Sequence, residues 1–184
     1  MPSIRFSIRR SIRWLPRVAT AAALALLAAC ASWPGVDDSS DFVIVRHAEK
    51  VLDGSKDPAL TAAGQARARA IADWLADADV VAVYSTDTRR THETAEPTAL
   101  AHGLSVALYD GGQPAEAFAA QLRQAHPAGT VLVVGHSNTA PAIASALCGC
   151  EVEPMTEAEY DRRMTVHIDG DGDITLLTAP QPPP

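Results

Sequence analysis

The sequence predicts an α/β fold: a three-layer sandwich with a mostly parallel central sheet, helices on both faces and an antiparallel hairpin at one edge. Three observations lead to this prediction. Short apolar runs rich in valine alternate with longer stretches of helical periodicity. The early runs lack polar alternation, as is typical of strands buried on both faces of a parallel sheet. The last two runs are separated by the sequence DGDG at 169–172, which favours a hairpin turn.

The elements follow in order from these patterns. The first strand, 42–45, consists of four apolar residues and ends at Arg46 and His47. Thr61 is a good N-cap for the first helix, and Gly103 is typical of the end of the second. The later predicted strands are 80–85, 104–109, 130–135, 164–168 and 174–177, and the predicted helices are 60–75, 88–102, 115–126 and one that begins at Asn138.

The first 29 residues have the composition of a targeting segment. Five arginines precede an apolar run at 18–29 that is too short for a stop-transfer helix. The run ends in LAAC at 27–30, which resembles a bacterial lipobox with cleavage before Cys30 and lipidation of its sulfur. Ala31 lacks the aspartate that favours inner-membrane retention in the lipoprotein pattern. We therefore expect a lipid-anchored protein of the outer membrane that faces the periplasm. The alternative is a plain signal peptide or Ala-rich helix in which Cys30 is incidental.

The remaining chain is predicted to form one domain between two irregular segments. Residues 30–40 are rich in Pro, Gly, Ser and Asp and are expected to form a tether, 41–179 to form the domain, and 180–184 (PQPPP) to form a tail. The chain has a formal net charge of −7, and its first 29 residues contain no acid, so the domain is more acidic still. This charge argues against nucleic acid as a partner. An anionic substrate must therefore be held by a local cluster of cations.

Polar residues follow three of the predicted parallel strands at the point where each strand ends. Arg46 and His47 follow the first strand, the sequence STDTRR at 85–90 follows the second, and GHSN at 135–138 follows the fourth. The carboxyl ends of parallel strands share one edge of the sheet, where ligands bind in open α/β folds. We expect these three segments to form one site.

The same segments resemble the signatures of the histidine phosphatase superfamily, the phosphoglycerate-mutase-like group (branch 1). RHA at 46–48 and GH at 135–136 match its two histidine motifs, and YSTDTRRTHETA at 84–95 is similar to its arginine motif, with the conserved arginine at Arg90. The sequence LTAAG at 60–64 resembles a further signature. The resemblance extends over residues 41–178.

The resemblance implies a role for each site residue. His47 is the nucleophile and forms a phosphohistidine, Arg46 and Arg90 bind the phosphoryl oxygens, and His136 donates to one of them. A carboxylate after the third strand acts as the general acid, and it is Asp110, with Glu116 as the alternative. The chemistry implied needs no metal or other cofactor.

The resemblance also indicates which of the family's reactions, hydrolysis or phosphoryl transfer within a mutase, the chain is expected to catalyse. Only about 45 residues separate Arg90 from His136, which is too short for the lid of a mutase. We therefore expect a phosphatase for a small phosphorylated substrate, either a broad range of phosphomonoesters or a periplasmic sugar or lipid-linked phosphate. Protein phosphohistidine is a second substrate class. The non-enzymatic alternatives are a phosphate- or glycan-phosphate-binding lipoprotein and a purely structural envelope lipoprotein; neither the substrate nor the oligomeric state is predicted.

Other chemically capable residues have simpler interpretations. Cys148 and Cys150 are separated by one residue, so two partly buried thiols are expected, with a strained disulfide formed in an oxidising periplasm as the alternative. A metal site on His47 and His136 lacks a further ligand at suitable spacing. Two other groups are assigned ordinary structural positions, with the rim of the site as the alternative for each. Glu49 and Lys50 are expected in a solvated loop, and Tyr160 and Asp161, which follow Glu153, Glu157 and Glu159, at a helix end.

Overall fold

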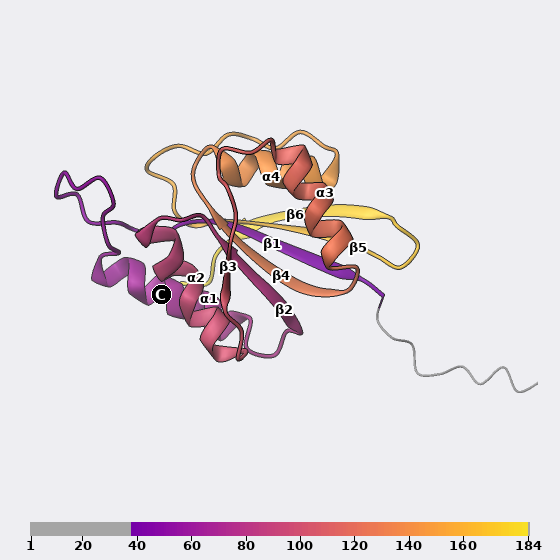
Figure 1. Ribbon diagram of the computed structural model, residues 1–184, viewed down its shortest axis with the longest axis horizontal. Helices are drawn as coiled ribbons and strands as arrows, with labels where there is room; N and C mark the ends of the chain where they lie inside the picture. Colours follow the sequence, from indigo (N-terminus) through magenta and orange to yellow (C-terminus); the bar gives the residue numbers. More distant parts are fainter. Residues whose placement is uncertain (1–37, 184) are drawn as a thin grey trace, which may run out of the picture. The chain divides into compact units, whose positions relative to one another are not determined.

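The computed structural model describes residues 38–183, so the predicted signal peptide, the predicted lipidation site Cys30 and most of the expected tether lie outside the described residues. Within 38–183 the chain forms a six-stranded sheet with helices on both faces (Figure 1). The strands are β1 (Ser40–Arg46), β2 (Val80–Ser85), β3 (Val106–Leu108), β4 (Gly129–Gly135), β5 (Arg162–Ile168) and β6 (Ile174–Pro180). The helices are α1 (Ala62–Trp74), α2 (Arg89–Ala101), α3 (Ala115–Ala125) and α4 (Thr139–Cys148).

The strand order is β3-β2-β4-β1-β5-β6, and the first four of these are parallel. Strand β5 runs antiparallel to β1, and β6 completes the hairpin at the edge. The predicted α/β fold with an antiparallel edge pair is therefore confirmed. Because β1 lies next to β4, their carboxyl ends are adjacent, with Arg46 paired to Gly135.

The core has two layers, one on each face of the sheet. Alternate residues of β1 point to opposite faces, as they must in an extended strand. Phe42 and Ile44 pack in the layer beneath α3 and α4, whereas Val43 and Val45 pack in the layer beneath α1 and α2. All four side chains are at most 1% exposed, which explains why the first strand shows no polar alternation.

The turn after β1 is held against the start of α1. The Thr61 N–H donates to the Glu49 carbonyl oxygen at 2.8 Å, and the Arg67 guanidinium pairs with the Glu49 carboxylate at 2.6 Å. A Cβ atom at Gly64 would lie 2.3 Å from the same Glu49 carbonyl oxygen, so only glycine allows this close approach. The LTAAG motif thus fixes the backbone two residues after His47.

Three expectations differ from the structure. Cys148 and Cys150 form a disulfide at the end of α4, where the left-handed Gly149 (φ 65°) brings the two sulfurs together. Pro180 pairs with Arg162 at the end of β6, and the next residue, Gln181, is buried, so the expected tail begins inside the domain.

The third difference concerns the segment between α4 and β5. No helix forms at 150–161, so the expected helix end is wrong. Instead the segment is a loop whose carbonyl groups are bound by arginine side chains. No helix within residues 38–183 combines the length and apolar character that crossing a membrane requires.

Candidate active site

The three predicted segments meet at the carboxyl ends of β1, β2 and β4. The His47 N–H donates to the Gly135 carbonyl oxygen at 2.9 Å and so continues the β1–β4 pairing past the end of the strands. A pocket of about 320 Å³ opens here. Its lining consists of Arg46, His47, Lys50, Arg90, His136, Ser137, Asn138 and Glu157.

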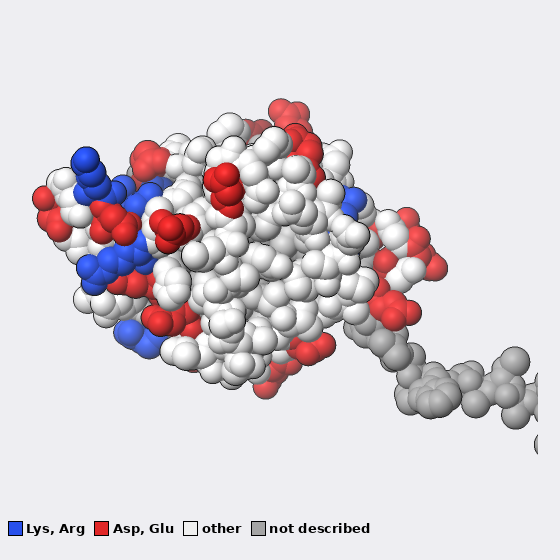
Figure 2. Space-filling model, in the orientation of Figure 1, with Lys and Arg blue, Asp and Glu red and all other residues white. Residues whose placement is uncertain are grey.

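The pocket is at an end of the domain where charged side chains concentrate. Figure 2 shows Lys and Arg gathered at one end of the visible face, intermixed with Asp and Glu, while most of that face carries few charges. The loop that follows β1 lies at the same end in Figure 1. The local cluster of cations that an anionic substrate requires is therefore present although the chain as a whole is acidic.

His47 is buried, with 2% of its surface exposed, and its ring is fixed by one hydrogen bond. Nδ1 lies 2.8 Å from the Ala48 carbonyl oxygen, which can only accept, so Nδ1 carries the hydrogen. Nε2 is then the nitrogen with the free lone pair. Burial lowers the pKa of His47 to about 4, and the positive charges of Arg46 and Arg90 add to this effect. Near pH 7 the side chain is a neutral imidazole with a nucleophilic Nε2.

His136 lies beside His47, with 5.5 Å between the two ring centroids. Its Nδ1 is 3.4 Å from Arg90 Nη2, which can only donate, and its Nε2 is 2.9 Å from Thr86 Oγ1. The neutral ring therefore accepts from Arg90 and donates to Thr86. Burial, followed by Arg90 and Arg46, lowers the pKa of His136 to about 4. To donate from Nδ1 to a phosphoryl oxygen, as expected, His136 must first take up a proton.

Arg46 is only 1% exposed and is the best-anchored side chain of the site. Its Nη1 donates to the carbonyl oxygens of Thr156, Glu157 and Glu159 at 3.1, 2.9 and 3.0 Å. Its Nη2 donates to Glu157 Oε2 at 2.9 Å, and its Cζ lies 4.4 Å from the centre of the Tyr160 ring. The arginine thus joins the end of β1 to the 156–160 segment of the chain.

The two adjacent arginines of the second motif have different surroundings. Arg90 lines the pocket, and its Nη1 lies 3.7 Å from Asp57 Oδ1. Arg89 is 59% exposed and pairs with Glu93 one helical turn away. The structure therefore places Arg90, and not Arg89, beside the two histidines.

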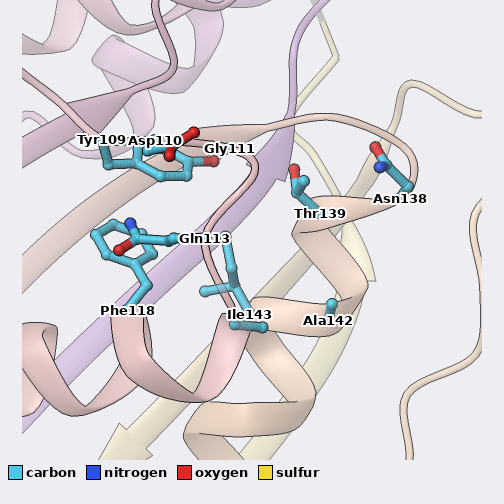
Figure 3. Close-up of a pocket in the computed structure, with 10 residues that line it drawn as sticks. Tyr109, Asp110, Gly111, Gln113, Phe118, Asn138, Thr139, Ala142 and Ile143 are labelled. Atoms are coloured by element: carbon cyan, nitrogen blue, oxygen red, sulfur yellow. The ribbon is translucent and has the colours of Figure 1, made fainter.

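Neither expected general acid is among the residues that line this pocket. Asp110 Oδ1 accepts a hydrogen bond from the Gly112 N–H at 2.8 Å. This bond closes a tight turn that leads the chain toward α3. Asp110 instead lines a neighbouring cavity of about 130 Å³ beneath the Tyr109–Gly111 loop and beside α4 (Figure 3). Glu116 is exposed in the first turn of α3. Asn138 lines both cavities, so the two are adjacent.

Sequence reasoning gave no role to several side chains of the site. Ser137 and Asn138 belong to the GHSN segment that was expected there, but only His136 was assigned a function. Lys50 lines the pocket, whereas a solvated loop was expected. Glu157 and Tyr160 were expected near a helix end, with the pocket rim only as the alternative, because they come from an irregular loop more than 100 positions after Arg46. Among residues 38–183 no cluster of three or more His, Cys, Asp or Glu side chains is placed to hold a metal ion.

Comparisons with known proteins agree with this architecture. Residues 42–111 match the model of the histidine phosphatase superfamily, branch 1. An uncharacterized protein of Mycobacterium tuberculosis, Rv0525, is 51% identical over 47 residues, which cover 26% of this chain and 23% of the relative. The match thus spans about a quarter of the length of that relative.

Two solved structures share the fold over most of the chain. The protein histidine phosphatase SixA, complexed with tungstate, has a TM-score of 0.61 and 22% identity, with 77% of this chain and 97% of SixA covered. A mycobacterial glucosyl-3-phosphoglycerate phosphatase has a TM-score of 0.61 and 16% identity, and the alignment covers 79% of this chain and 100% of the phosphatase. Residues 42–111 thus resemble the histidine phosphatase superfamily, branch 1, and the two solved structures share the fold of the described chain.

Proposed function

We propose that this protein is a phosphatase that hydrolyses phosphomonoesters through a phosphohistidine on His47, without a metal ion. The observation that carries the proposal is the hydrogen bond from His47 Nδ1 to the Ala48 carbonyl oxygen, which leaves the lone pair on Nε2. A site that only bound phosphate would need cations, but not an imidazole held in this tautomer. The family match and the fold of known phosphatases support the same reading.

The first chemical step is attack of His47 Nε2 on phosphorus. The N–P bond forms as the bond from phosphorus to the leaving oxygen breaks, and the electron pair of that bond leaves with the oxygen. The Nε–H groups of Arg46 and Arg90 are buried and have no partner within residues 38–183, so they are donors that a phosphoryl oxygen can satisfy. These donors and Lys50 stabilise the charge that spreads over the phosphoryl oxygens.

In the second step the oxygen of a water molecule bonds to phosphorus as the N–P bond breaks. The electron pair of that bond returns to His47 Nε2, and the protons of the water leave with the inorganic phosphate, so His47 is again neutral. Binding of the phosphoryl dianion raises the pKa of His136 because its negative charge favours the imidazolium. A protonated His136 then donates from Nδ1 to a phosphoryl oxygen. We assign it this stabilising role in both steps.

The leaving group receives little help from the described residues that line the pocket. Glu157 is the carboxylate among them, and its hydrogen bond to Ser137 and the charge of Arg46 lower its pKa, so it is a poor acid. Such a site favours leaving groups that depart without a strong acid. Phosphohistidine, whose imidazole leaves readily, is therefore a second candidate substrate, and SixA is named a protein histidine phosphatase.

The test is hydrolysis of p-nitrophenyl phosphate by the purified protein in the presence and absence of EDTA. We expect turnover that EDTA leaves unchanged, because the arginines and Lys50 supply the positive field. Saturable binding of inorganic phosphate without turnover would instead favour the non-catalytic binding protein. A folded protein with neither property would favour a purely structural role.

The pH dependence follows from the lowered pKa of His47, about 4. His47 attacks only when neutral, so protonation removes activity as the pH falls through this value. We expect kcat, measured at saturating substrate where the bound dianion keeps His136 protonated, to be flat from about pH 5.5 to 7.5 and to fall near pH 4. Initial rates in buffers of constant ionic strength measure this profile. A tenfold rise from pH 7 to 5 would point instead to a carboxylic acid such as Asp110.

We also propose that the protein is anchored in the cell envelope through lipid on Cys30, in the outer membrane facing the periplasm. The basic segment, the short apolar run and the LAAC sequence support this location. Fractionation of cells that express the wild type or Cys30→Ala tests it. The wild type should sediment with outer membranes, and the variant should not; equal distribution of the two proteins would refute lipid anchoring.

A further inference from the structure

A carboxylate occupies the cation pocket where a phosphoryl group is expected. Glu157 Oε2 lies 2.9 Å from Arg46 Nη2, and Oε1 accepts from the Ser137 hydroxyl. The Glu157 side chain is 74% exposed, whereas Arg46 is 1% exposed. A solvent-accessible anion is thus paired with a buried cation of the site, and it can rotate away while the arginine stays in place.

The main chain that carries Glu157 does not depend on this carboxylate. Arg46 Nη1 binds three carbonyl oxygens of segment 156–159. Arg162 binds the Glu159 carboxylate through Nε at 2.6 Å and Nη2 at 2.9 Å. When a phosphoryl oxygen replaces the Glu157 carboxylate on Nη2, these bonds keep the backbone of residue 157 next to the pocket, and the displaced carboxylate remains at its mouth.

The charges around the pocket are nearly balanced before substrate arrives. Arg46, Arg90 and Lys50 are positive, and both histidines are neutral near pH 7 because each has a pKa of about 4. Glu157 and Asp57 each lie against one of the two arginines. A phosphate dianion therefore brings negative charge into a site that already contains carboxylates, and a positive charge elsewhere on the substrate would offset it.

We propose that Glu157 is a specificity-determining residue of the proposed phosphatase, and that it selects substrates whose leaving group carries a positive charge close to phosphorus. An ammonium or imidazolium group has this property. The displaced carboxylate attracts such a group and repels a leaving group that carries a carboxylate or a second phosphate. This inference rests on the proposed function, because it assumes that the phosphoryl group binds at Arg46 and Arg90.

The test compares O-phosphoethanolamine with n-propyl phosphate, which has the same number of heavy atoms but no positive charge. Calorimetric titration of the full-length His47→Ala protein measures binding without turnover. For two charges about 5 Å apart at a solvated pocket mouth, we expect the ammonium compound to bind about five to ten times more tightly. Adding Glu157→Gln should reduce this ratio to about one and tighten binding of n-propyl phosphate.

Glu153→Gln is the matched control, since it removes the same charge from an exposed position of the same loop, outside the pocket lining. It should leave the ratio unchanged. Equal affinities in the protein with native Glu157, or a ratio that Glu157→Gln does not change, would overturn the inference. If the wild type fails to hydrolyse p-nitrophenyl phosphate, the proposed function fails, but the binding ratio still decides the role of Glu157.

Discussion

Replacement of His47 by alanine should lower kcat for p-nitrophenyl phosphate by at least about 10⁴-fold, the scale observed when a catalytic nucleophile is removed. The variant retains the arginines, so inorganic phosphate should still bind. No other described residue presents a free imidazole nitrogen to the pocket except His136, whose Nδ1 is paired with Arg90. Steady-state kinetics and phosphate titration of the same preparation separate loss of chemistry from loss of binding.

Trapping of the intermediate makes this prediction specific. Wild-type protein quenched in alkali after brief exposure to a ³²P-labelled substrate should retain label, because phosphohistidine is stable in base, whereas His47→Ala should not. His126→Ala is the control: His126 bonds to Tyr84 at 2.9 Å, and it does not line the pocket. Activity of His47→Ala within tenfold of the wild type would exclude His47 as the nucleophile.

Replacement of Arg46 by alanine should reduce both stability and activity. Three buried or partly buried carbonyl oxygens and the Glu157 carboxylate would lose their donor. We expect the free energy of unfolding to fall by about 3 kcal/mol, typical of a broken buried network, and kcat/KM to fall by about 10³-fold. Urea denaturation and steady-state kinetics measure the two effects.

Arg89→Ala is the matched control for Arg46→Ala. Arg89 is 59% exposed, and its pair with Glu93 is a surface contact, so its removal should change the stability by less than about 0.5 kcal/mol. Wild-type stability in Arg46→Ala would show that the loop at 156–160 does not depend on the guanidinium.

The parts of the molecule that could be predicted from the sequence are those with local patterns. The uninterrupted apolar run at 42–45 predicted a central strand, and β1 is hydrogen-bonded on both sides. Thr61 is the N-cap of α1, with its side chain accepting from the Gly64 N–H as expected. Because carboxyl ends of parallel strands share an edge, the meeting of His47 and His136 also followed from topology.

The parts that could not be predicted depend on long-range placement. Segment 156–160 has no periodicity, and only the antiparallel pairing of β5 with β1 brings it back to Arg46. The position of Asp110 could not be predicted, because the sequence shows that a carboxylate follows β3 but not that a turn closed by Gly112 carries it to the adjacent cavity. The Cys148–Cys150 bond depends on the left-handed conformation of Gly149, which one sequence does not reveal.

The position of β1 has a consequence for how the protein folds. This first strand is hydrogen-bonded to β4 and β5, whose residues come some 90 and 120 positions later in the chain. Such distant pairings form slowly, because long stretches of chain must be ordered before the contacts stabilise them. A chain that emerges from the ribosome or crosses a membrane from its amino terminus therefore has no assembled site until residues near 160 are available to hold Arg46. Assembly of the pocket is therefore among the last events in the folding of a newly made molecule.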